Sequence, residues 1–219
     1  MYDIYELSAS GGERSERFTA YRQAAEERKP VFGYNPMTRE PVIDTIRELI
    51  NLDAEAIASE TANETAVKIG LELDATMHLS VATPGMWTDR LGTEVEHRLK
   101  AVDPTGILIW YDDEITVKQI RDEAIGQTVR LKAISERKGR PAATLEEAVT
   151  QEGTALALAG AVGTFHQRAA DILTSRSDDP SLATMVAFLY GDNDASAMGY
   201  TPIGLDNRTG YSHAIAIHS

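Results

Sequence analysis

The sequence contains no cysteine, few aromatic residues (6%) and no apolar run long enough to span a bilayer. The absence of cysteine excludes disulfide bridges, thiolate zinc sites, iron–sulfur clusters and a cysteine nucleophile. The most apolar stretch, residues 153–165, has 13 residues. A membrane-spanning helix needs roughly 18–20. We therefore expect a soluble globular protein that makes no contact with a membrane.

Basic residues are also scarce: the 219-residue chain has 21 Lys and Arg against 34 Asp and Glu. Its net charge is therefore −13. An acidic chain repels phosphate backbones over long distances, which argues against a nucleic-acid partner. The N-terminus lacks the basic and apolar segments of a signal peptide, so we expect a cytoplasmic location, or an intracellular one within an assembled particle. Since no linker divides the chain, we expect one globular domain over residues 1–219.

Hydrophobic periodicity predicts a mostly helical α/β or α+β fold with a small sheet of about four strands. The clearest strand is the apolar run at 107–111, and the other expected strands lie at 2–7, 77–82 and 214–217. Helices are expected where apolar residues recur every three or four positions. They cover residues 13–29, 41–50, 53–70, 83–99, 117–134, 144–172 with a break near 160–163, and 179–191.

The junction at Thr83, Pro84 and Gly85 is the best candidate for ligand binding, because a strand is expected to end and a helix to begin there. Free backbone amides and the helix dipole attract phosphate or carboxylate groups at such a point. Thr88 and Arg90 follow closely enough to contribute, with Arg90 as an electrostatic clamp. The alternative is an ordinary helix N-cap with proline in the first turn.

Two carboxylates, Asp112 and Asp113, follow the 107–111 strand, at the end of a parallel sheet where ligands gather. They indicate a divalent-cation site, or they complement the dipole of the following helix. No other cofactor is expected. His78 and His97 are the candidate general bases. The alternative for His97 is a surface position on its helix, beside a core formed by Val95 and Leu99.

A basic patch interrupts the acidic background between residues 130 and 140, and six acids face one lysine between residues 53 and 74. This charge distribution favours head-to-tail self-association or docking on a charged partner. Two solvated helix faces are the alternative. The basic patch consists of Arg130, Lys132, Arg137, Lys138 and Arg140.

Three hypotheses about function follow, because the usual nucleotide-binding and hydrolase motifs are absent. The first is a non-catalytic assembly or protein-interaction component of a symmetric homo-oligomer, for example in a virus or phage particle. The second is an enzyme that acts on a phosphate- or carboxylate-bearing small molecule at the 83–85 helix N-terminus. It requires the predicted clamp, cation ligands and base to converge in one pocket. The third and weakest hypothesis is that the basic patch binds a nucleic acid or an acidic partner.

Overall fold

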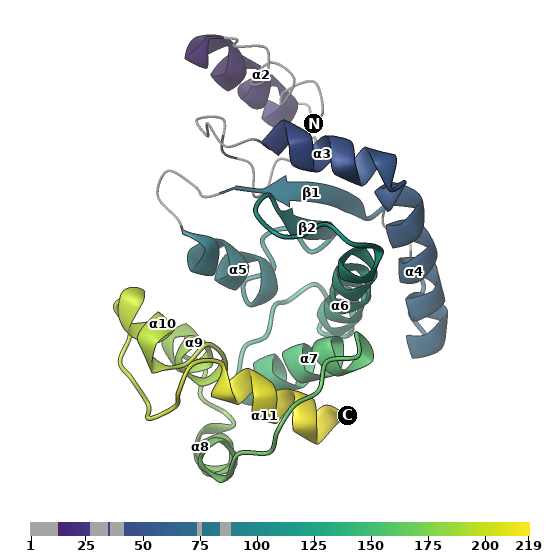
Figure 1. Ribbon diagram of the computed structural model, residues 1–219. Helices are drawn as coiled ribbons and strands as arrows, with labels where there is room; N and C mark the ends of the chain where they lie inside the picture. The colour runs from purple at the N-terminus through teal and green to yellow at the C-terminus, as the bar shows by residue number, and fades with distance from the viewer. Residues whose placement is uncertain (1–12, 27–34, 36–41, 74–75, 84–88) are drawn as a thin grey trace. The chain divides into compact units, whose positions relative to one another are not determined.

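A computed structural model describes residues 13–26, 35, 42–73, 76–83 and 89–219. The described residues are mostly helical and contain one small parallel sheet (Figure 1). The chain divides into two compact units, which are described separately. Unit 1 comprises Met1–Thr93 and Thr105–Ala124, and unit 2 comprises Glu94–Pro104 and Ile125–Ser219. Whether the two units form one domain stays a prediction.

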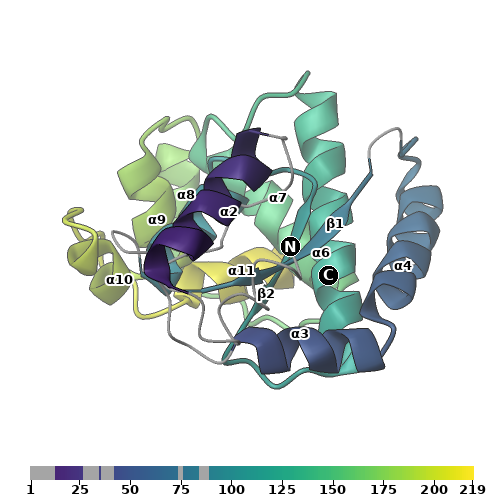
Figure 2. The same cartoon turned by 90° about the horizontal axis from the view of Figure 1, so that it is seen from above.

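Unit 1 is built around two parallel strands, β1 (His78–Ala82) and β2 (Gly106–Trp110). All five residues of β2 are buried, as expected for the continuous apolar run at 107–111. The helices α3 and α4 both contact β1 (Figures 1 and 2). The helices that belong wholly to unit 1 are α2 (Arg14–Glu26), α3 (Val42–Asn51) and α4 (Ala54–Ile69). The unit boundaries fall within α5 (Arg90–Arg98) and α6 (Val117–Glu136).

Alternation along the strands sends their side chains to two different clusters. Val81, Ile107 and Ile109 belong to the main core of unit 1, together with residues from α3, α4 and α6. Ala82, Leu108 and Trp110 form a smaller cluster. The register pairs Ala82 with Trp110, so both strands end at the same edge of the sheet.

The predicted four-stranded sheet is wrong, because the described residues form only two strands. Residues 2–7 lie outside the described residues. Residues 214–217 are helical and belong to α11 (Thr209–His218), in which Ala214 and Ile215 are neighbours that are both buried. Adjacent residues of a strand point to opposite faces, so the short alternation in this segment was too weak a signal to separate a strand from a helix.

Several predicted helix boundaries are confirmed. The C-cap of α4 is Gly70, with φ +68°. The Oγ1 atom of Thr144 accepts a hydrogen bond from the Glu147 amide at the start of α7 (Leu145–Leu158). The predicted break then separates α7 from α8 (Gln167–Arg176). By contrast, α9 (Leu182–Leu189) begins later than the predicted residue 179, and its N-cap is Ser181. The Asp179 carboxylate accepts hydrogen bonds from Ser181 and Thr184.

Unit 2 is held together by close contact between α7 and α11, which lie side by side in both views (Figures 1 and 2). The remaining short helix of this unit, α10, covers Asp192–Ala197. Glycines allow the backbones to approach closely. A Cβ atom on Gly153 would lie 2.5 Å from the Ala214 carbonyl oxygen, and one on Gly210 would lie 1.9 Å from the Phe188 carbonyl oxygen. These glycines therefore fix how tightly α11 packs against α7 and α9.

We predict that Gly210→Ala destabilises the protein by about 2–3 kcal/mol, because the added methyl group overlaps a backbone atom that has no alternative rotamer. The free energy of unfolding from urea denaturation measures the loss. Thr209→Ala, at the neighbouring position of the same helix, is the control and is expected to change stability by less than about 0.5 kcal/mol. A Gly210→Ala protein as stable as the parent would show that the backbones of α9 and α11 are not tightly packed.

Candidate functional site

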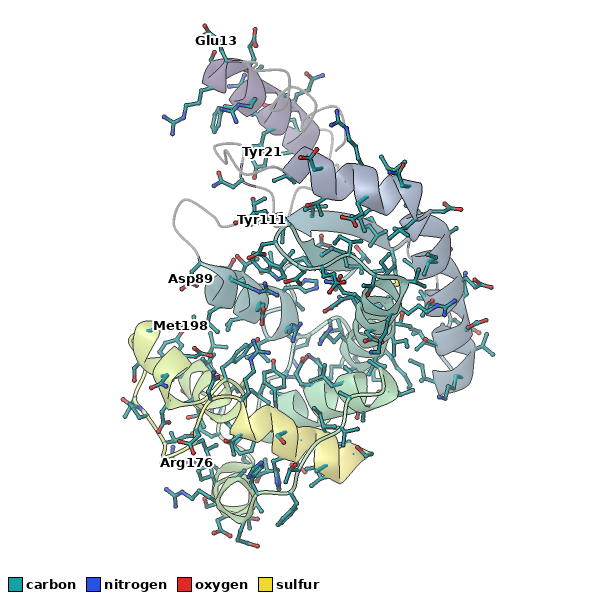
Figure 3. The ribbon with its side chains drawn as sticks, viewed as in Figure 1. Glu13, Tyr21, Asp89, Tyr111, Arg176 and Met198 are labelled. Carbon is teal, nitrogen blue, oxygen red and sulfur yellow. The ribbon has the colours of Figure 1, made fainter. Side chains whose placement is uncertain are left out.

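The predicted anion site lies at the edge of the sheet where β1 and β2 end, but only part of it is described. Thr83 is buried, and its Oγ1 atom accepts a hydrogen bond from the Asn35 amide at 3.0 Å. Pro84, Gly85 and Thr88 lie outside the described residues. The described helix begins at Arg90, and the Asp89 carboxylate caps it by accepting the Gly92 amide at 2.8 Å (Figure 3). Asp89, not Thr83, therefore caps α5.

The structure brings Arg90, the predicted clamp, together with Asp112 and Asp113, the predicted cation ligands. These side chains bind one another. The Arg90 guanidinium contacts both carboxylate oxygens of Asp113, at 2.8 and 3.1 Å, and Asp112 at 3.5 Å. It also lies 4.9 Å from the centre of the Trp110 ring. Gln119 donates a further hydrogen bond to Asp113 at 3.1 Å. A bidentate arginine of this kind satisfies the carboxylate geometrically and electrostatically, so Asp113 already has a cationic partner.

His78, one of the two candidate bases, does not join this group. His78 is the first residue of β1, four residues before Ala82, so it lies about 13 Å from the end of the strand at roughly 3.3 Å per residue. His97 belongs to unit 2. Among the described residues, no cluster of three or more His, Asp or Glu side chains could hold a metal ion. Within unit 1, His78 therefore does not converge with Arg90, Asp112 and Asp113.

Unit 2 contains a buried ion pair that the sequence interpretation missed. The Nε and Nη2 atoms of Arg130 donate hydrogen bonds to the two carboxylate oxygens of Glu152, at 2.8 and 2.9 Å. The Arg130 side chain is only 3% exposed and the Glu152 side chain 0%. Gln151 donates one hydrogen bond to Glu152 and another to the Arg98 carbonyl oxygen. The pair thus joins α6 to α7, while Gln151 ties α7 to the end of α5.

The positions of the two residues on their helices explain why the pair is buried. Arg130 lies three residues after the buried Gln127 and four before the buried Ile134, so it falls on the inner face of α6. Glu152 follows Ala148, also buried, by four residues on α7. Because a buried charge without a partner is costly, Arg130 and Glu152 on two buried helix faces are expected to pair with each other.

The predicted basic patch is therefore smaller than expected, because Arg130 is buried. The other members are largely matched by neighbours. Lys132 pairs with Glu136, Arg137 donates a hydrogen bond to Gln151, and Arg140 contacts both carboxylate oxygens of Glu147. The hydrogen bonds from Arg140 and from the Ala143 amide lower the pKa of Glu147 to about 2. Lys138 has a left-handed backbone conformation just after α6.

Tyr211 interacts electrostatically with the ion pair and belongs to a group of aromatic and charged residues in unit 2. The rings of Tyr190 and Tyr211 meet edge to face, 5.1 Å apart, and the Arg208 guanidinium lies within 6 Å of both. Arg208 also contacts Glu94 at 3.5 Å. Both tyrosine side chains are buried, which raises the pKa of Tyr211 to about 12 and that of Tyr190 well above its usual value.

The protonation states of His97 and Glu152 are fixed at neutral pH. Burial, followed by the charges of Arg130 and Arg98, lowers the pKa of His97 to about 3. Burial alone opposes ionisation of Glu152, but the charge and hydrogen bonds of Arg130 outweigh it and lower the pKa of that carboxyl. A general base works best when its pKa lies near the operating pH. His97 is a poor base by this criterion, and the arrangement suits a structural role.

We predict that Glu152→Leu and Arg130→Met each destabilise unit 2 by about 3–5 kcal/mol, because each leaves one buried charge without its partner. The double variant Arg130→Met/Glu152→Leu is expected to recover most of this loss. Urea denaturation of the four proteins gives the coupling free energy. Additive losses in the double variant would show that the two side chains do not depend on each other.

We also predict that His97 makes the protein less stable in acid. The unfolded histidine binds a proton below about pH 6.5, whereas in the folded state its pKa is about 3. Its contribution is therefore complete above pH 6.5 and is lost as the pH falls towards 3, by about 2 kcal/mol at pH 5. Urea denaturation at pH 7 and pH 5 tests this in the parent and in His97→Gln. An equal loss in both proteins would contradict the assignment.

Comparisons with known proteins do not assign the site. No family model matches the chain, and neither a curated protein nor a solved structure matches it. In the part of the chain that the structure describes, no helix is long and apolar enough to cross a bilayer. The functional argument therefore depends on the contacts and charges of the chain itself.

Proposed function

We propose that the protein is a non-catalytic assembly component that associates with copies of itself into a symmetric homo-oligomer. The observation that carries this proposal is a surface of unit 2 without charged side chains. Residues 159–166 and 209–219 contain no Asp, Glu, Lys or Arg, although these residues make up 25% of the chain. We call the surface formed by these two segments the uncharged face.

The two segments of the uncharged face contact each other directly. The Thr164 amide donates a hydrogen bond to the Ser212 Oγ atom at 2.9 Å, and the His166 amide donates one to the His213 Nδ1 atom at 3.2 Å. The rings of Phe165 and His213 lie 4.9 Å apart. Residues distant in sequence therefore form one continuous surface.

Large apolar side chains on the uncharged face are exposed. Val162 is 96% exposed, Phe165 56% and Ile217 42%. Burial lowers the pKa of His213 and of His218, so both imidazoles are neutral at pH 7. Adjacent exposed apolar residues mark surfaces that bind partners more often than isolated ones do.

A second copy of the chain is the partner that this surface fits. An apolar face without charges is complementary to itself, as a two-fold symmetric contact requires. Two copies that each carry a charge of −13 repel each other, and they approach at least cost where neither presents a charged side chain. Head-to-tail association through the basic patch has less support, because most members of that patch are already paired.

The enzyme hypothesis has less support among the described residues. Asp113 holds the guanidinium of Arg90, and the pKa of His97, at about 3, makes it a weak base. His78 lies at the far end of β1 from Asp113. An anion bound at residues 83–85 would therefore have to compete with the Asp113 carboxylate for the Arg90 guanidinium.

We predict that the protein elutes as an oligomer at micromolar concentration and that added salt increases the oligomer fraction, because salt screens the repulsion between acidic copies. Size-exclusion chromatography with light scattering measures both. Val162→Asp is expected to shift the protein to monomer. Val67→Asp, at an 83% exposed position of α4 in unit 1, introduces the same change elsewhere and is the matched control.

Three results would count against the proposal. One is a monomer at every salt concentration. Another is an equal oligomer fraction in the Val162→Asp and Val67→Asp proteins. The third is an oligomer that dissociates in high salt, which would favour head-to-tail association between oppositely charged surfaces.

A further inference from the structure

A groove of about 880 Å³ lies in unit 1 beside α4 and the start of β1. Ala58 and Ala62 of α4 line it together with Leu79 and Ile107 of the sheet. Small-molecule sites usually have volumes of roughly 300–1,000 Å³ and mostly apolar walls. The groove therefore has the size and lining of a ligand site, and it involves none of the residues of the uncharged face.

The composition of α4 explains why the groove exists. The fully buried residues of this helix are alanines and threonines, whose short side chains fill little space, and Ile57 packs against the core while partly buried. Interiors are normally packed without voids larger than a water molecule. Ala58 and Ala62 line the groove, so their short side chains leave space there, and they belong to a set of six small buried residues on α4. These residues are Ala54, Ala58, Thr61, Ala62, Thr65 and Ala66.

The groove is also strongly acidic at one end, where Asp53 and Glu55 line it. The positive end of a helix dipole is worth about half a charge, so α4 cannot neutralise two carboxylates. Asp53 makes no side-chain capping bond to the helix that it precedes. Glu60 and Glu64 on the same helix add negative charge. Among the described residues, no ion pair joins any of these four carboxylates to a cation.

This acidic end contrasts with the other carboxylates described above. Asp113 and Glu152 each bind an arginine through both oxygens, and Glu147 does the same at the protein surface. Asp53 and Glu55 line the groove, and among the described residues neither forms an ion pair with an arginine or a lysine. Charge and lining together specify the chemistry of a complementary ligand.

We propose that the groove binds an organic cation that carries an apolar chain, such as an alkylammonium ion. The ammonium group would lie beside Asp53 and Glu55, and the chain would pack against Ala58, Ala62 and Leu79. Lengthening the chain removes more apolar surface from water, so each additional buried methylene should raise the affinity roughly fourfold. Salt should weaken binding, because it screens the attraction between the ammonium and the carboxylates.

The test is an NMR titration of the full ¹⁵N-labelled chain with hexylammonium chloride at low salt. We expect saturable shifts of the amides of Ala58, Ala62 and Leu79. Butylammonium should bind more weakly than hexylammonium, as the methylene argument requires. Hexan-1-ol, which has the chain without the charge, should bind at least tenfold more weakly. The same titration of the Val162→Asp protein should be unchanged, which separates this inference from self-association.

Two double variants test the role of the carboxylates. Asp53→Asn/Glu55→Gln should lower the affinity for hexylammonium at least tenfold. Asp53 has φ +54°, a conformation that asparagine also tolerates, so this variant should keep the fold. Glu60→Gln/Glu64→Gln removes the same charge from α4 at positions that do not line the groove, and it should lower the affinity less than threefold. Ala62→Met, which places a longer side chain in the groove, should abolish binding while the ¹⁵N spectrum of this variant shows that it is folded.

Three outcomes would overturn the proposal. Equal affinities for hexylammonium and hexan-1-ol would show that the carboxylates do not recognise the ligand. Equal losses in the two double variants would show a diffuse charge effect rather than a site. Shifts that do not saturate at millimolar ligand, or that spread over unit 2 instead of the groove, would show that the hollow binds no cation of this class.

Discussion

The buried pair between Arg130 and Glu152 is the interaction on which unit 2 most depends. Removing two charges from water costs several kcal/mol each, and only a bidentate contact with additional hydrogen bonds offsets that cost. The structure meets this requirement, because both guanidinium contacts are short and Gln151 donates to the same carboxylate. The pair therefore fixes one arrangement of α6 against α7, since any shift of either helix would leave a charge unsatisfied. The close contacts at Gly153 and Gly210 then hold α11 against α7 and α9, after the ion pair has fixed how α6 packs against α7.

The same principle separates the parts of the molecule suited to internal structure from those suited to binding. Arginine is already engaged at Asp113, Glu147 and Glu152, and a group that is matched in this way has little to gain from a ligand. The two remaining surfaces are different in kind. The uncharged face exposes apolar residues and has no charged side chain, whereas the groove beside α4 combines apolar and polar walls with two acids that have no described cation. Their partners must therefore differ, because one surface complements itself and the other complements a cation.

Local sequence signals predicted much of the fold but little of the site. The strand at 107–111, the end of α4 at Gly70 and the break between α7 and α8 each depend on residues that lie close together in sequence. Arg130 and Glu152 are 22 residues apart, and neither residue alone shows which way it faces. The interpretation of Arg130 as part of a surface patch failed for that reason. Similarly, Arg90, Asp112 and Asp113 were expected together, but the sequence could not show that they would bind one another instead of a ligand. The groove was not predicted, since a hollow depends on the distance between α4 and the sheet.

Ionic strength affects the two proposed surfaces in opposite directions, and this follows from the net charge of −13. Repulsion between copies limits contact through the uncharged face, so screening favours self-association. Attraction between Asp53, Glu55 and an ammonium group drives binding in the groove, so screening disfavours it. A cation held in the groove also lowers the charge that each copy carries, and it thereby reduces the repulsion that self-association must overcome. The two equilibria are then linked through charge alone, and by reciprocity an oligomer, with its larger negative charge, must bind the cation more tightly than a monomer does.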